Sequence, residues 1–152
     1  MTIEDIAAQV RAQPGRVVTV QLTGEDATRL VCDLDIALDD GSDIEPGVHF
    51  VLGRSCRTRE AAIAQFVAAL RLPYAASEGW DDFLYQLGEG SAGSRQCVVV
   101  ADAQDLLAGD PEARTELLQN LPSGPHCLGG GWTTLVLAES PGAATMNETG
   151  QA

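Results

Sequence analysis

The chain has 152 residues, which suits one domain with a single core, and 45% of them are hydrophobic. Nine arginines and no lysine stand against 22 acidic residues, so the formal net charge is −13. This charge repels nucleic acids and anionic membranes and attracts basic proteins or cations. Neither nucleic acid nor membrane is therefore an expected partner. A role in solubility alone is the other explanation of the acidity.

Compartment and metal chemistry can be judged from the amino terminus and the cysteines. The first residues are acidic and lack the basic and apolar regions of a secretory signal. No apolar run approaches the ~18 residues of a membrane-spanning helix. We therefore expect a cytoplasmic protein. Four cysteines form no CxxC pair, which favours buried, reduced thiols over a zinc site: Cys32, Cys56, Cys97 and Cys127.

The first 46 residues predict a helix followed by a β-hairpin. Ile3, Ile6 and Val10 share one side of a helix that ends at Pro14. Residues 16–22 then alternate between apolar and polar side chains. The alternation returns after a polar turn, at Leu30, Cys32 and Leu34, which is typical of a second hairpin strand. A polar segment rich in Gly and Pro separates this extension from the rest of the chain.

The remaining chain alternates strands with helices. Apolar runs predict strands at 48–52, 97–101 and 132–138, with helices at 58–70, 80–87 and 110–121. Thr58 and Asp110 are expected to cap two of these helices, and Asp102 a brief one. Strands separated by helices pair in parallel, so we expect an α/β fold in which a three-stranded parallel sheet packs with helices. Residues 1–46 would pack on this domain of residues 47–139, and 140–152 would be a disordered tail.

No group of residues predicts catalysis, a cofactor or a metal site. Gly129 to Gly131 lead into a strand without a following GK[ST] sequence, so they do not form a phosphate-binding loop. His126 and Cys127 are adjacent and lack a third, orienting residue. His49 lies among apolar residues and is expected to be packed. We therefore do not expect an enzyme.

One basic cluster interrupts the acidic sequence: Arg54, Arg57 and Arg59. Three arginines in a chain of this charge are a weak signal for nucleic-acid binding. We expect them to form salt bridges in a loop next to a helix.

The strongest candidate site is the segment from Tyr74 to Glu89. Apolar residues at positions i, i+3, i+4 and i+7 predict the buried stripe of a short helix: Trp80, Phe83, Leu84 and Leu87. The opposite face carries acids around Tyr85, and no basic residue occurs between Arg71 and Arg95. We interpret this face as a surface for a cationic partner. An ordinary solvated helix face is the alternative.

This segment resembles the barstar family of intracellular ribonuclease inhibitors. The similarity starts at Leu72-Pro73, includes Gly79-Trp80-Asp81-Asp82-Phe83-Leu84-Tyr85-Gln86-Leu87, and extends through the predicted strands over residues 47–139. It implies a barstar-like fold and an inhibitor that plugs the basic active site of a secreted microbial ribonuclease of the guanyl-specific type, or of a related toxin. The alternative is an immunity or regulatory binding module on this scaffold whose partner is not a ribonuclease.

The expected partner-binding residues lie on this loop and helix, with one acid from a later helix: Tyr74, Ser77, Glu78, Gly79, Asp81, Asp82, Leu84, Tyr85 and Glu116. Asp81 matches the aspartate of the family motif. Tyr85 stands where the family has a second aspartate, and Gly79 where it has asparagine. These departures imply a partner different from that of the better-matched family members.

Overall fold

The computed structural model describes residues 2–39, 46–90, 95–121 and 131–140. Four strands form one parallel sheet in the order β1-β4-β3-β2. Five α-helices and three short 3-10 turns accompany it, and the elements follow one another as α1 (Ile3–Ala12), β1 (Val17–Gln21), α2 (Gly24–Ala37), β2 (Gly47–Leu52), η1 (Gly53–Ser55), α3 (Arg59–Leu70), η2 (Tyr74–Ser77), α4 (Trp80–Gly90), β3 (Arg95–Ala101), η3 (Ala103–Asp105), α5 (Pro111–Gln119) and β4 (Trp132–Glu139). The predicted α/β class is confirmed.

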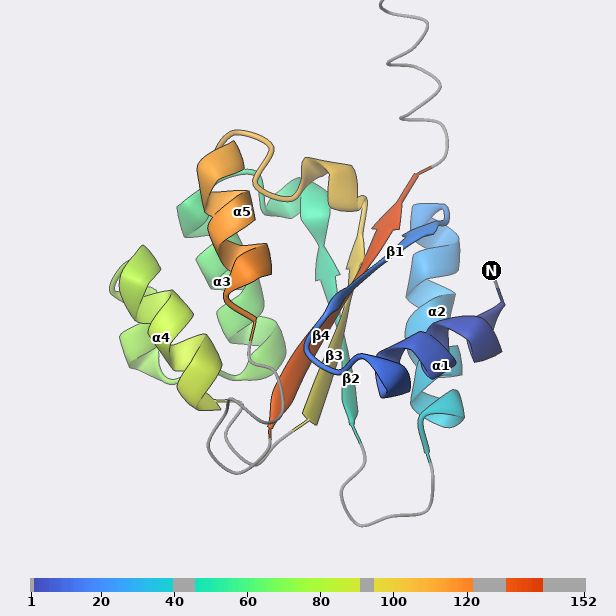
Figure 1. The fold of residues 1–152 in the computed structure, drawn as a ribbon. Helices are drawn as coiled ribbons and strands as arrows, with labels where there is room; N and C mark the ends of the chain where they lie inside the picture. The colour runs from blue at the N-terminus through green and yellow to red at the C-terminus, as the bar shows by residue number, and fades with distance from the viewer. Residues whose placement is uncertain (1, 40–45, 91–94, 122–130, 141–152) are drawn as a thin grey trace, which may run out of the picture.

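Helices cover both faces of the sheet. Figure 1 shows α3, α4 and α5 on one side and α1 with α2 on the other. Because successive strand residues point to opposite faces, β3 supplies both cores. Val98 and Val100 belong to the core under α3, α4 and α5, whereas Cys97 and Val99 belong to the core under α1 and α2.

The predicted hairpin in the N-terminal extension is wrong. Its second strand is part of α2, and β1 pairs in parallel with β4 instead. Leu30 and Leu34 satisfy an alternating pattern, but they also continue a helical series that starts at Ala27 and ends at Leu38, and all four are buried. Thr23 begins the helix by accepting a hydrogen bond from the amide of Asp26 at 3.2 Å. In the helix this series packs against the sheet. The predicted strand took only the alternation of residues 30–34 into account and not the helical spacing from Ala27 to Leu38.

The other predicted elements agree with the structure within a few residues. Thr58 accepts a hydrogen bond from the amide of Ala61, and Asp110 accepts one from the amide of Ala113, as expected of helix caps. Asp102 does not cap the brief helix η3 through its side chain. Its backbone is left-handed instead, with φ of 48°.

Gly53 marks the point where β2 leaves the sheet and passes close to the end of β3. A Cβ atom on Gly53 would lie 2.5 Å from the carbonyl oxygen of Asp102 and 2.7 Å from that of Ala101. Both are backbone atoms, so neither can swing away. This close approach of β2 to the end of β3 therefore requires glycine at position 53.

The cysteines differ from one another in exposure. Cys56 and Cys97 are buried as expected, and burial raises the pKa of their thiols to about 11 and about 12. Cys32 is exposed on α2, contrary to the prediction. Cys127, the neighbouring His126, the glycines at 129 and 130, and the predicted tail after Ser140 lie outside the described residues. Among the described residues, no helix has the length and apolar content needed to cross a membrane.

Candidate functional site

The helix that carries the candidate site is held by its apolar stripe. Phe83 and Leu87 are buried in the core between α3, α4 and α5, and Trp80 is only 8% exposed. The Phe83 ring packs edge-on against Phe66 of α3 at 5.9 Å and lies 5.4 Å from the ring of Trp80. Aromatic contacts of this geometry add to the free energy gained from burial. The stripe predicted from the sequence therefore fixes the orientation of α4.

A polar network joins this helix to its two neighbours. The Trp80 indole donates a hydrogen bond from Nε1 to Glu116 Oε2 at 3.1 Å. The Arg59 guanidinium lies over the Trp80 ring at 5.4 Å, and its Nε donates to Asp110 Oδ2 at 2.6 Å. The hydrogen bond from Arg59, followed by that from the amide of Ala113, holds the pKa of the Asp110 carboxyl below its usual value. Helices α3, α4 and α5 are therefore connected around the indole.

The opposite face of α4 and the turn η2 are open to solvent. Tyr74 is 83% exposed and Tyr85 is 64% exposed. Glu78, Asp81 and Asp82 are exposed among them. The ion pairs of the described residues involve other acids. We call the turn and this helix face the η2–α4 surface; within the described residues its carboxylates form no ion pair.

A groove of about 380 Å³ borders this surface, between α3 and the start of α4. Residues 77–80 line one side of it. The other side comes from α3, where Ile63 and Ala64 are apolar and Arg59 and Glu60 are charged. The groove gives a partner side chain a place to insert next to η2 and the start of α4.

The structure places eight of the nine predicted site residues on η2, α4 and the two residues between them. Leu84 is half-buried and packs against the core, so it contributes an edge of the surface. Glu116 lies on α5, and its carboxylate accepts the hydrogen bond from Trp80. Its structural role is therefore to hold α4. A direct role of any of the nine in binding stays a prediction.

The expected salt bridges of the arginine cluster are confirmed. Arg57 pairs with Asp105 at 2.7 Å and Arg59 with Asp110 at 2.6 Å. Arg54 lies 3.8 Å from the carboxylate of Asp102. The cluster thus neutralises acids at the carboxyl edge of the sheet. Within residues 2–39, 46–90, 95–121 and 131–140, no group of His, Cys, Asp or Glu is arranged to hold a metal ion.

Sequence reasoning missed a second surface feature, a groove between α1 and α2, because it assigned α2 to a strand. One residue of α2 indicates this groove. Ile36 lies between the buried Leu34 and Leu38 in the sequence, yet its side chain is 75% exposed.

Comparison with known proteins gives a likeness in fold only. No family model and no curated protein matches the chain. A solved structure of the ORC2 protein from Aeropyrum pernix, in ADPNP–ADP complexes, is similar with a TM-score of 0.60 and 12% sequence identity. The similarity covers 96% of this chain but 42% of the ORC2 chain, so this chain spans less than half of that protein.

The expected membership of the barstar family is therefore wrong. No family model supports it, and the structural similarity is to an ORC2 protein. The sheet also has a fourth parallel strand, β1, where the expectation was a hairpin. The description of this chain as a barstar-like ribonuclease inhibitor rested on this resemblance and is therefore not supported. The η2–α4 surface stands on its own exposure and charge.

Proposed function

We propose that this chain is a non-catalytic binding protein that holds a basic partner protein on the η2–α4 surface. One observation carries the proposal: exposed Tyr74 and Tyr85 stand among carboxylates on a helix fixed by a buried aromatic stripe. Tyrosine is enriched among the residues that dominate binding energy at protein interfaces. It offers a large contact area at low cost in conformational entropy.

The charge of the surface defines the partner's chemistry. Glu78, Asp81 and Asp82 add a local negative field to a chain of net charge −13. Such a field speeds the encounter with a basic protein and is screened by salt. The tyrosines would set the lifetime of the complex, because buried anchors act mainly on dissociation. Asp81 and Asp82 also stabilise the first turn of α4 through the helix dipole, so their effect on binding has to be separated from their effect on folding.

An adenine nucleotide is the second candidate ligand, since the similar ORC2 protein is described in ADPNP–ADP complexes. Phosphate-binding loops join a strand to a helix through a GxxxxGK[ST] segment. Here only Leu22 and Thr23 separate β1 from α2, and the chain contains no lysine. Glu25 and Asp26 occupy the first turn of α2, where phosphate would lie. The residues between β1 and α2 therefore do not fit a nucleotide-binding site, and we propose no nucleotide-dependent activity.

The test of the proposed function uses the full chain as bait and then its purified partner. We expect the partner to be basic and its affinity to fall as salt concentration rises. The variant Asp81→Asn/Tyr85→Ala should bind at least about tenfold more weakly, as expected for an interface anchor. The matched control Asp35→Asn removes an exposed acid from α2, across the sheet, and should keep its affinity.

Two results would contradict the proposal. One is equal affinity of the double variant for the purified partner, with both proteins folded by circular dichroism. The other is a partner whose binding does not respond to salt. Either result would mean that the partner does not bind at the η2–α4 surface.

A further inference from the structure

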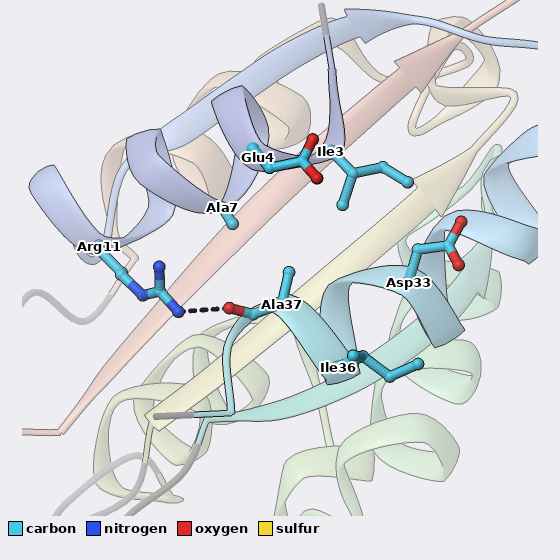
Figure 2. A pocket seen from close by; sticks show the side chains of 7 residues that line it. All are labelled: Ile3, Glu4, Ala7, Arg11, Asp33, Ile36 and Ala37. Carbon is cyan, nitrogen blue, oxygen red and sulfur yellow. Dashed lines mark hydrogen bonds between the residues drawn. The ribbon is translucent and has the colours of Figure 1, made fainter. Parts of the chain in front are cut away.

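The groove between α1 and α2 has a volume of about 430 Å³ and lies on the other side of the sheet from the η2–α4 surface. Ile3 and Ala7 line it from α1, and Ile36 and Ala37 line it from α2 (Figure 2). Ile36 is 75% exposed, more than any other large aliphatic side chain among the described residues. Water therefore covers an apolar groove with an isoleucine on its rim.

The two ends of the groove carry opposite charges. Figure 2 shows Arg11 at one end and Asp33 at the other. Glu4 is in the first turn of α1 and Arg11 in its last, about 10 Å apart at a rise of ~1.5 Å per residue. The Arg11 guanidinium donates a hydrogen bond to the carbonyl oxygen of Ala37, which fixes it beside α2 and leaves other N–H groups available.

A groove with a positive end and a negative end is complementary to itself. When a two-fold axis passes near its middle, each Arg11 faces Asp33 and Glu4 of the other copy. A symmetric dimer interface requires this self-complementarity, because the same patch serves both copies. A patch of one charge sign would repel its own copy.

We propose that a second copy of this chain covers the α1–α2 groove and forms a symmetric dimer. The interface combines the apolar lining of the groove, which includes Ile36, with charge pairs at both ends. It leaves both η2–α4 surfaces open on the outer sides. The proposal rests on α1 and α2 alone and does not depend on the proposed function.

The affinity of the dimer should depend on salt concentration in a different way from the affinity for a basic partner. Two chains of net charge −13 repel each other, and exposed charge pairs contribute little to binding. Screening of the overall repulsion should therefore strengthen the dimer as salt rises from low to moderate concentration. Binding of a basic partner at the η2–α4 surface should respond in the opposite direction.

The first experiment measures the mass of the full chain in solution by light scattering and sedimentation over a range of concentrations. One chain has a mass of 16.0 kDa, and we expect twice that value at high concentration. Ile36→Asp places a charge in the apolar part of the interface and should weaken the dimer by tenfold or more, on the order expected for losing a buried isoleucine. Thr115→Asp adds the same charge to α5, across the sheet, and should leave the dimer unchanged.

A charge-swap experiment separates the interface from effects on folding. Arg11→Glu alone and Asp33→Arg alone each place like charges opposite each other in the dimer, so each should dimerise more weakly than the wild type. A mixture of these two variants restores opposite charges at both ends and should dimerise. Unfolded or damaged variants would not recover on mixing.

Three results would overturn the proposal. The first is a monomer at every concentration up to about 1 mM, the range of the weakest specific complexes. The second is a dimer that persists in Ile36→Asp, which places the contact elsewhere. The third is a mixture of the swapped variants that dimerises no more strongly than either variant alone, although each is folded.

Discussion

Gly53 offers a sharp test of the packing at the carboxyl edge of the sheet. In Gly53→Ala the new Cβ would lie 2.5 Å from the carbonyl oxygen of Asp102, whereas ordinary contact begins at 3.4 Å. The backbone of β3 must therefore withdraw by about 0.9 Å, the difference between these distances. Overpacking of a rigid site costs about 1–3 kcal/mol. At about 2–4 °C per kcal/mol for a chain of this size, the melting temperature should fall by about 2–12 °C.

The matched control is Gly88→Ala in α4, where a Cβ meets nothing within 4 Å. Alanine is favoured over glycine in a helix by about 0.5–1 kcal/mol, so this variant should melt at a slightly higher temperature than the wild type. Thermal unfolding followed by circular dichroism measures both changes. If Gly53→Ala melts at the wild-type temperature or above it, the close approach of β2 to the end of β3 is wrong.

Three further variants test the core and the charged groups. Phe83→Ala should lower the free energy of unfolding by about 3–5 kcal/mol in urea titrations, because a fully buried ring is lost; a change below about 1 kcal/mol would show that the side chain is not in the core. Burial, with a smaller contribution from Arg71, lowers the pKa of His49 below 6.5, so the unfolded chain binds the proton more tightly and stability falls as the pH drops below 6.5. The urea midpoint of His49→Asn should fall less over that range, and an unchanged pH profile would argue against the burial of this imidazole. The pKa of Asp110 is lowered from 3.8 by the hydrogen bond from Arg59, so its carboxylate stabilises the fold above pH 3.8 and loses that effect as the pH falls through the lower folded value. The stability difference between wild type and Asp110→Asn should shrink over that acidic range, whereas a constant difference would mean that the charge is unimportant.

Local signals in the sequence were sufficient for most elements. Thr58 and Asp110 precede helices and cap them, because side chains of this kind satisfy the free amides of the first turn whatever surrounds them. The strands were recognisable because β3 and β4 are covered on both faces and therefore read as continuous apolar runs. Such patterns depend only on residues close together in the sequence, so they can be recognised without knowledge of the fold.

Features that depend on contacts between residues far apart in the sequence could not be predicted. Residues 30–34 fit both an alternating and a helical pattern, and only the packing of Ala27 and Leu38 against the sheet decides between them. The exposure of the η2–α4 surface followed from the helical positions of Trp80 and Phe83. The bond from Trp80 to Glu116 did not, because the two residues are 36 positions apart and the relative placement of α4 and α5 is set by the core.

The position of β1 in the sheet has a consequence for the order in which the protein folds during synthesis. β1 is made before the other three strands of this sheet, yet its neighbour in the sheet is β4, and Gln21 contacts Glu139 across 118 positions. Until residues 132–139 have left the ribosome, β1 lacks its neighbour in the sheet, and the core under α1 and α2 lacks Trp132, Val136 and Ala138. Closing so long a loop is slow, so the amino-terminal third must wait for the carboxyl-terminal strand. A chain cut short before β4 would therefore expose its first-made segments to degradation or aggregation.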